Sequence, residues 1–348
     1  MGKRPKRILV FGYFGYVTDQ LDGQTVKTRA IYDLLKERHD GRVDFADSQQ
    51  FRHSIGSVFR FFRDLARCNV LVWLPARNNF KYLFPVIWML SKLFRFKILY
   101  LVIGGWLSDF IGELPLHGRL LHHIEKILVE NLIVKQELES RYGISNSIVF
   151  PNFRELSPAP VQRESDGVLR LVFLARVHRM KGLEILQDLC EYISSSEKLA
   201  HRISLDFYGQ INEPDKNYFF DNLVNKFEFV EYHGPLNPSL INSVLQKYDM
   251  LVLPTRWFTE GFPGSILDAY QAGIPVAVTA WKHAREFVAD GKSGFIVDFD
   301  NPLPELKDIV TRLAYNPSEL KSMKEKAYRE SLRYTPDVAW SLLSAFIS

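Results

Sequence analysis

Residues 250–279 read MLVLPTRWFTEGFPGSILDAYQAGIPVAVT and contain a strand, a glycine-bearing loop, a helix and a second strand in succession. The runs Met250–Leu253 and Pro275–Thr279 are short and apolar, and they carry the branched residues that buried strands favour. The segment Gly264–Ala272 between them predicts a helix. Two strands joined through a helix are typical of a parallel sheet with helices on its faces.

The same alternation of strands and helices extends through the rest of the chain. Further strands are predicted at Ile8–Gly12, Val43–Ala46, Val70–Leu74, Lys97–Ile103, Ile127–Glu130, Ser147–Phe150, Leu169–Ala175, Ile203–Tyr208, Phe227–Glu231 and Phe295–Val297. Helices are predicted at Gln24–Arg38, Ser54–Ala66, Lys81–Phe94, Val134–Tyr142, Lys181–Ile193, Lys216–Val224, Pro238–Lys247 and Arg285–Ala289, and through most of the last forty residues.

A polar, proline-rich segment at 151–167 interrupts this alternation and is interpreted as an interdomain linker. The predicted class is α/β, with two doubly wound, Rossmann-like domains facing each other across a cleft. We expect one domain over residues 1–155 on the acceptor side and a nucleotide-sugar-binding domain over 156–334. A last helix at 335–348 is expected to return towards the first domain.

Composition excludes several broad classes. The chain has 348 residues, of which 47% are hydrophobic and 24% charged, which is too apolar for a disordered chain. Its 44 basic and 40 acidic residues give a net charge of +4, a weaker basic excess than nucleic-acid binders usually show. Cys68 and Cys190 lie too far apart for a disulfide framework and form no zinc-binding motif, which fits a reducing compartment.

No segment is long enough for a membrane-spanning helix, since the apolar run Tyr82–Leu90 has about half the required length. The basic N-terminus followed by Ile8–Val17 has the outline of a signal peptide. Two glycines interrupt the run, however, and no cleavage site follows it. We therefore interpret residues Arg7–Tyr13 as a first buried strand.

The loop and helix quoted above also place two carboxylates near each other. Glu260 precedes the predicted helix, and Asp268 lies about one turn inside it. Free backbone N–H groups at a helix start can hold ligand oxygens, and glycines allow a ligand to approach closely. Such carboxylates can bind two different hydroxyl groups of one ligand. The alternative is a capping acid followed by a solvated helix acid.

This segment resembles the Glu-x7-Glu element of retaining glycosyltransferases with the GT-B architecture, in particular those of family four. Further motifs of that family follow the right order across residues 169–300: Arg176-Val-His-Arg-Met-Lys181-Gly182, Asp206-Phe-Tyr-Gly209, Tyr232-His-Gly234-Pro-Leu236 and Glu286-Phe-Val-Ala-Asp290-Gly291-Lys-Ser-Gly294. Looser points of similarity are Gly23-Gln24-Thr25, Ile103-Gly-Gly-Trp106 and Pro151-Asn152. The combination is similar to enzymes that build bacterial capsular polysaccharide or exopolysaccharide.

The resemblance implies a role for each matching residue. Arg176 and Lys181 would hold the donor diphosphate, while Glu260 would bind hydroxyls of the transferred sugar, and these three residues are expected to carry catalysis. Asp268 would bind the ribose. The remaining expected donor contacts are Gly23, Gln24, Thr25, Gly209, Pro235, Leu236, Gly261, Phe262, Pro263, Gly264 and Ser265.

The chain also departs from the family pattern. Ala175 stands where the family usually has glycine, and Asp268 replaces the second glutamate. Many members carry a histidine after the fourth strand, where this chain has Gly104, Gly105 and Trp106. Gly105, Trp106 and Asp109 are therefore the candidates for the acceptor side, although the position of Asp109 favours a solvated loop acid.

Metal and dinucleotide motifs are weak. Asp298-Phe-Asp300 has the form of a metal-binding Asp-x-Asp, but its position after a late strand favours a solvated turn. Gly12-Tyr-Phe-Gly15 is not the dinucleotide fingerprint. We therefore expect no metal, no resident cofactor and no nucleic-acid partner.

The stretches Phe51–Arg67 and Lys81–Lys97 mix aromatic and basic residues. Helices of this composition can lie on anionic membrane surfaces. The alternative is a pair of core helices with their arginines directed to solvent. The family resemblance favours membrane contact, because such polymers are assembled on lipid-linked acceptors.

The function that the resemblance implies is metal-independent, retaining hexosyl transfer. The sugar would move from a nucleotide-diphosphate donor to a glycan or polyprenyl-linked glycan. The enzyme would be cytoplasmic and peripheral on the inner face of the plasma membrane. A nucleotide-sugar 2-epimerase of the same architecture and a non-catalytic sugar-nucleotide-binding partner remain alternatives.

Overall fold

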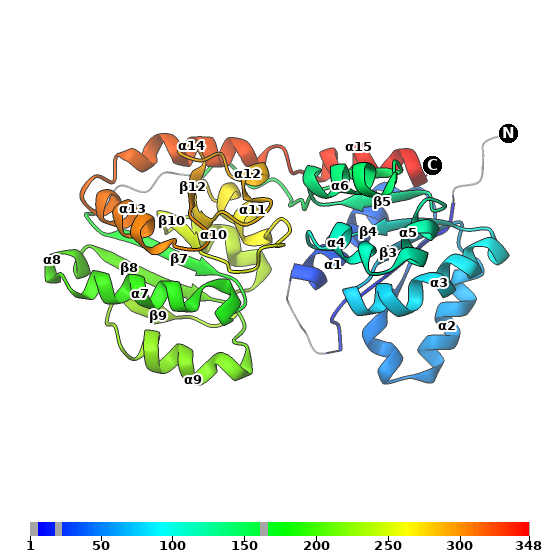
Figure 1. Ribbon diagram of the computed structural model, residues 1–348, viewed down its shortest axis with the longest axis horizontal. Helices are drawn as coiled ribbons and strands as arrows, with labels where there is room; N and C mark the ends of the chain where they lie inside the picture. Colours follow the sequence, from blue (N-terminus) through cyan, green and yellow to red (C-terminus); the bar gives the residue numbers. More distant parts are fainter. Residues whose placement is uncertain (1–5, 18–22, 161–165, 348) are drawn as a thin grey trace. The chain divides into compact units, whose positions relative to one another are not determined.

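The computed structural model describes residues 6–17, 23–160 and 166–347 of the chain. It divides into two compact units, one formed by Met1–Phe153 with Pro336–Ser348 and the other by Arg154–Thr335 (Figure 1). Residues 1–5, within the basic N-terminus, and 161–165 of the expected linker lie outside the described ranges. Each unit contains one parallel sheet of six strands.

The sheet of the N-terminal unit has the order β2-β1-β3-β4-β5-β6. Its strands are β1 (Ile8–Gly12), β2 (Val43–Asp47), β3 (Val70–Leu74), β4 (Lys97–Leu101), β5 (Lys126–Val129) and β6 (Ser147–Val149). Its helices are α1 (Gly23–Arg38), the 3-10 helix η1 (Ser48–Arg52), α2 (Ile55–Leu65), α3 (Arg77–Phe94), α4 (Leu107–Gly112), α5 (Pro115–Leu121), α6 (Leu132–Tyr142) and the C-terminal α15 (Pro336–Ile347).

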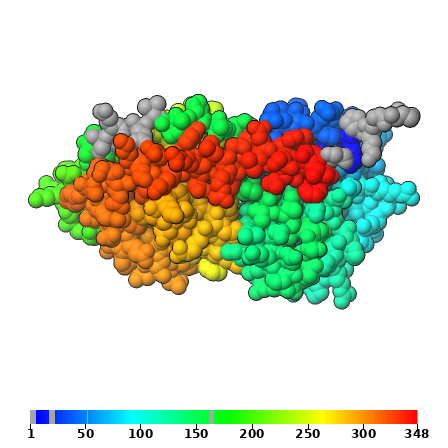
Figure 2. All heavy atoms as spheres, turned by 90° about the horizontal axis from the view of Figure 1, so that it is seen from above, coloured from blue at the N-terminus to red at the C-terminus, as the bar shows by residue number. Residues whose placement is uncertain are grey.

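Two apolar clusters cover the two faces of this sheet. Helices α2 to α6 pack on one face through a cluster that includes Phe61, Phe84 and Leu138. Helices α1 and α15 pack on the other face, where Ile31 and Leu343 join strand residues. The space-filling view shows α15 in red on the surface of this unit (Figure 2). The fully apolar burial of β1 and β3 follows from cover on both faces.

The sheet of the C-terminal unit has the order β12-β11-β10-β7-β8-β9. Its strands are β7 (Leu169–Leu174), β8 (Ile203–Tyr208), β9 (Val230–Tyr232), β10 (Met250–Leu253), β11 (Val276–Thr279) and β12 (Gly294–Val297). Its helices are η2 (Arg179–Lys181), α7 (Leu183–Ser194), α8 (Glu197–Ala200), η3 (Glu213–Asp215), α9 (Lys216–Phe219), η4 (Phe220–Val224), η5 (Pro238–Leu240), α10 (Ile241–Leu245), α11 (Gly264–Gln271), α12 (Ala284–Phe287), α13 (Leu303–Tyr315) and α14 (Glu319–Ser331).

The α/β class with two Rossmann-like sheets is confirmed, and every predicted strand is present. The boundaries of β9 were wrong, because Phe227 N donates to Leu223 O and Val230 N to Phe227 O. Because of these turns, strand β9 begins only at Val230. The helix predicted from Lys181 begins instead at Leu183, since Gly182 adopts a left-handed φ of 93°.

Helix α3 begins at Arg77, one turn earlier than predicted. The prediction missed this turn because the polar residues Asn78 and Asn79 interrupt the helical spacing of apolar residues. The short helices α4, α5 and α8 were missed altogether. Within the described ranges, no helix combines the length and hydropathy that crossing a lipid bilayer requires.

Candidate functional site

The strand order of the C-terminal sheet places a switch point between β7 and β10. These two strands pair in parallel, with Leu251 opposite Val172, while the chain continues from β7 to β8 on one side and from β10 to β11 on the other. In open α/β sheets, ligands bind beyond the carboxyl ends of the strands at such a point. The loops after β7 and β10 contain the predicted residues Arg176, Lys181 and Glu260.

The structure brings Lys181 and Glu260 into direct contact. Lys181 Nζ lies 2.6 Å from Glu260 Oε2, and the two side chains are 14% and 17% exposed. Thr255 Oγ1 lies 3.2 Å from the same carboxylate oxygen. Lys181 Nζ also lies 4.9 Å from the centroid of the Trp257 ring. One cation and one carboxylate are therefore held together at the switch point.

Two glycines allow the neighbouring loops to approach this pair. Gly182 has a φ of 93°, and a Cβ atom there would overlap the carbonyl oxygen of Pro254. Gly209 has a φ of 138°, and its Cβ would overlap the carbonyl oxygen of Ala175. Because both contacts are with backbone, a side chain at either position would push the loop away. These positions therefore require glycine.

The second predicted carboxylate has a partner that the sequence did not reveal. Arg154 Nε donates to Asp268 Oδ1 at 2.7 Å, and Asp268 is buried on α11. A Cβ atom at Gly264 would lie 2.6 Å from the Arg154 guanidinium, which therefore sits beside the first turn of α11. Arg154 was hidden in the proline-rich linker, and the only signal was its charge directly after Pro151-Asn152-Phe153.

The predicted loop at 261–265 leads into α11. The Phe262 ring stacks on Phe287 with centroids 4.1 Å apart and is only 2% exposed, so its side chain belongs to the core. Ile266 N donates to Pro263 O at the start of α11. Gly261 and Pro263 are buried, whereas Gly264 and Ser265 are half-buried.

The other predicted donor residues of this unit lie on loops after neighbouring strands. Arg176 is exposed directly after β7. The loops after β8 and β9 are joined, since Gly209 N donates to Gly234 O at 3.0 Å. Next along the chain, Pro235 is exposed and Leu236 is half-buried.

His178 was missed by the sequence analysis. Its Nδ1 accepts a hydrogen bond from Met180 N at 3.0 Å, and its ring stacks on Trp257 with centroids 5.2 Å apart. His178 therefore shapes the turn that leads to Lys181.

The predicted residues Gly23, Gln24, Thr25, Gly105, Trp106 and Asp109 lie in the N-terminal unit. Gly23 opens α1, and Thr25 is fully buried on it. The indole of Trp106 donates to Ile103 O at 2.6 Å, so its polar atom is used within its own loop. Asp109 accepts from Arg141 at 3.1 Å at an exposed position.

A buried ion pair supports the loop after β4 and was not predicted. Lys27 Nζ lies 2.6 Å from Glu130 Oε1, with the side chains 5% and 3% exposed. Gly104 N donates to Glu130 Oε2 at 3.1 Å. Glu130 thereby connects α1 to the loop that contains Gly104, Gly105 and Trp106.

The sequence Asp298-Phe-Asp300 forms an exposed turn. Asp298 Oδ1 accepts hydrogen bonds from the backbone N–H groups of Asp300 and Asn301, at 2.9 and 2.7 Å. This carboxylate is therefore used in closing its own turn.

Residues 159–330 match the family model described as "Glycosyl transferases group 1". A D-inositol 3-phosphate glycosyltransferase from Arthrobacter sp. (strain FB24) is 23% identical over 53% of this chain and 43% of its own length. The putative colanic acid biosynthesis glycosyltransferase WcaL from Salmonella typhimurium is 25% identical over 42% of this chain and 35% of its own length. The matches thus span less than half the length of these curated relatives.

The fold of the whole chain resembles solved structures at low sequence identity. HepE from Anabaena, in complex with UDP-glucose, superposes with a TM-score of 0.74 at 15% identity and covers 98% of each chain. Sucrose-phosphate synthase from Thermosynechococcus elongatus superposes with a TM-score of 0.75 at 13% identity and the same coverage. These similarities and the two sheets show the GT-B fold, and residues 159–330, just under half of the chain, match the family of group 1 glycosyl transferases.

Proposed function

We propose that the protein is a retaining glycosyltransferase that moves a sugar from a nucleotide-diphosphate donor to a glycan or lipid-linked glycan. The observation that carries this proposal is the Lys181–Glu260 pair at the switch point of the C-terminal sheet. It lies inside the segment that matches the family model. The nucleoside diphosphate leaves as the acceptor oxygen bonds to the anomeric carbon, and the acceptor proton is released.

The charges at the site suit this reaction. Negative charge grows on the diphosphate as the sugar leaves, and Lys181 with Arg176 would stabilise it. Glu260 would accept hydrogen bonds from hydroxyls of the transferred sugar. Asp268 has two acceptor oxygens, so its bond to Arg154 leaves capacity for the ribose hydroxyls.

The choice of donor and acceptor for a first assay comes from the relatives. HepE has been solved with UDP-glucose, which supports UDP-sugars as the first donor panel. The name of WcaL refers to colanic acid, and a 24% identical Klebsiella pneumoniae protein comes from a cps region. Both support a polysaccharide or lipid-linked oligosaccharide acceptor.

The decisive experiment combines a UDP-sugar panel with a polyprenyl-linked acceptor and follows UDP release, glycan product and its anomeric configuration by NMR. Transfer with the donor's configuration supports the proposal. Inverted product would contradict retention. Conversion of the donor to its 2-epimer would identify the epimerase alternative, and binding without turnover would identify a non-catalytic partner.

Transfer is expected to keep its full rate in excess EDTA, because Arg176 and Lys181 supply the positive charge that faces the diphosphate. The measurement compares initial rates with and without EDTA after dialysis. Complete loss of transfer, restored by Mn²⁺, would contradict this expectation and direct attention to Asp298 and Asp300.

We also propose that the N-terminal unit binds anionic membranes through the outer faces of α2 and α3, here called the α2–α3 surface. Large apolar side chains on it are exposed: Ile55 by 76%, Phe59 by 72%, Tyr82 by 68%, Met89 by 59% and Leu93 by 69%. Phe61 and Leu65 do face the core, as the core-helix alternative requires, but that alternative leaves the exposed residues unexplained. Exposed basic residues accompany them at Arg60, Arg63, Arg67, Lys81, Lys92 and Arg95.

The triple change of Arg60, Arg63 and Arg67 to serine is expected to weaken binding to phosphatidylglycerol vesicles by roughly 100-fold. The basis is a contribution of about 1 kcal/mol for each basic residue near an anionic surface. Vesicle cosedimentation measures the effect, and hydrolysis of soluble donor should be unchanged. Changing the exposed Lys36, Arg42 and Arg119 to serine removes the same charge elsewhere on this unit. An equal loss in that control would show that only net charge matters.

A further inference from the structure

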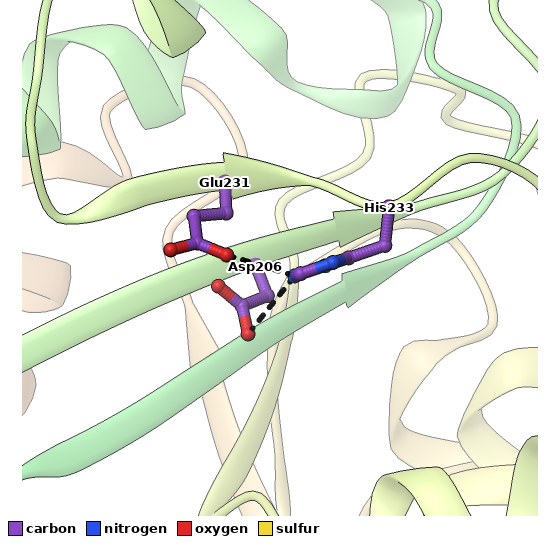
Figure 3. Close-up of side chains that lie close together, drawn as sticks. All are labelled: Asp206, Glu231 and His233. Carbon is purple, nitrogen blue, oxygen red and sulfur yellow. Dashed lines mark ion pairs between the residues drawn. The ribbon is translucent and has the colours of Figure 1, made fainter.

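Three potential metal ligands lie together at one edge of the C-terminal sheet, away from Lys181 and Glu260, which follow other strands. Asp206 on β8 lies opposite Glu231 on β9 in the parallel register. His233 lies directly after the end of β9, and its imidazole points towards the two carboxylates (Figure 3). Strand β9 is an edge strand of this sheet.

The two distances from His233 to the carboxylates fit ligands of a single ion. His233 Nε2 lies 3.4 Å from Asp206 Oδ2 and 3.5 Å from Glu231 Oε2. One ligand atom from each residue lies within 4.8 Å of the others. Ligands at 2.0–2.2 Å from a tetrahedral zinc ion are about 3.3–3.6 Å apart. We propose that Asp206, Glu231 and His233 bind a zinc ion.

Neighbouring aromatic residues hold two of the three ligands in place. Tyr248 donates a hydrogen bond to Asp206 Oδ2 at 2.6 Å, and its hydroxyl lies 3.0 Å from that of Tyr208. The Tyr208 ring stacks on the His233 imidazole with centroids 4.9 Å apart and an interplanar angle of 21°. Outer partners of this kind orient metal ligands, and their loss commonly lowers metal affinity by about 10–100-fold. We expect a loss in this range when Tyr248 or Tyr208 is changed.

An ion from solution can reach the two carboxylates of the group. Asp206 and Glu231 line an open hollow of about 290 Å³ together with Tyr248, and Glu231 is 68% exposed. Two cations, Arg170 and Lys247, line the same hollow. Arg170 donates hydrogen bonds at 2.9 and 2.6 Å to the two carboxylate oxygens of Asp166.

The donor set favours zinc over magnesium. It combines one imidazole with two carboxylates, and imidazole is a ligand for zinc and other late transition metals, whereas magnesium prefers oxygen ligands and water. Three protein ligands leave a fourth position for water. Two carboxylates and a neutral imidazole carry a charge of −2, which a divalent ion would neutralise.

A zinc ion here would join the edge strand β9 to β8. Lys181 and Glu260 follow β7 and β10, so the ion would contribute to stability and not to the diphosphate chemistry. The inference does not depend on Lys181 or Glu260, although the predicted donor contacts Gly209 and Pro235 lie in the loops that follow β8 and β9. Transfer that survives EDTA remains compatible with it.

The test uses the full chain without a histidine tag, stripped with EDTA and dialysed. Calorimetric titration with ZnCl2 is expected to show one site per chain, and zinc is expected to raise the thermal midpoint. His233→Gln should weaken zinc binding at least 100-fold, and Tyr248→Phe about 10-fold. Glu231→Gln changes an exposed side chain and serves as the second ligand variant, so the test does not depend on the folding of the first.

His201→Gln is the matched control, since it also removes a histidine beside a glutamate, with His201 Nε2 3.8 Å from Glu197 Oε1 at the surface. It should keep the affinity of the wild type. The proposal is wrong if the wild type binds zinc no more tightly than His233→Gln, or if His201→Gln loses as much affinity. Equal stabilisation by MgCl2 would also overturn it, because the imidazole would then play no part.

Discussion

Replacing Lys181 by alanine is expected to lower the turnover of sugar transfer by about 10²–10³-fold, as removal of one transition-state donor does in acyl-transfer enzymes. Lys181 is the half-buried cation of the switch point, and charge on the leaving diphosphate grows during the reaction. The affinity for UDP should fall as well, because the free diphosphate already carries much of that charge.

Glu260→Gln should affect the two measurements differently. Glutamine keeps the size of the side chain but removes the anion that would hold the sugar hydroxyls, so transfer should fall steeply. UDP lacks the transferred sugar, and loss of the anion beside Lys181 frees this cation for the diphosphate. UDP affinity should therefore hold or rise.

Calorimetric titration with UDP and a transfer assay compare the Lys181→Ala and Glu260→Gln variants with the wild type. Lys321→Ala, an exposed lysine on α14, is the control for loss of one charge in the same unit. If Glu260→Gln loses UDP affinity as severely as Lys181→Ala while both proteins stay folded, then Glu260 does not bind the sugar.

The buried pair in the N-terminal unit is expected to dominate the stability of that unit. Lys27→Met removes the ammonium group 2.6 Å from the Glu130 carboxylate, whose side chain is 3% exposed. Breaking a buried pair from one side lowers the free energy of unfolding by about 3–5 kcal/mol. Urea denaturation followed through the transition of the N-terminal unit measures the change.

Two controls sharpen this prediction. The double change Lys27→Met with Glu130→Leu removes both charges and should recover most of the loss. The pair Lys97–Glu125 has the same separation, 2.6 Å, but its side chains are 45% and 30% exposed. Lys97→Met should therefore change stability by about 1 kcal/mol or less. A similarly small effect of Lys27→Met would mean that water reaches the inner pair.

Most strands could be predicted from sequence because a parallel strand covered on both faces is a short apolar run, as β1 and β3 are. Their order in the sheet could not be read from such runs. The end of a strand also depends on local hydrogen bonds, and those at Phe227 and Val230 moved the start of β9.

Site residues that belong to a local sequence motif could be predicted, whereas contacts with a residue far away in the sequence could not. Lys181 and Glu260 each stand in a recognisable segment, although nothing in either segment indicates that they touch. Arg154 and Asp268 are 114 positions apart, and Lys27 and Glu130 are 103 apart. Only the folded chain brings such pairs together, because no periodic pattern links residues at these separations.

The position of α15 has a consequence for how the protein is made. Its residues Ala339, Leu343 and Ile347 complete the apolar cluster that contains Ile31 and Leu34 of α1. During synthesis, the first 153 residues leave the ribosome well before this helix, and residues 154–335 follow in between. At about 5–20 residues per second, that interval lasts roughly 10–40 s. One face of the first sheet therefore remains partly uncovered for that time, so the newly made chain offers chaperones an apolar surface until its last helix emerges.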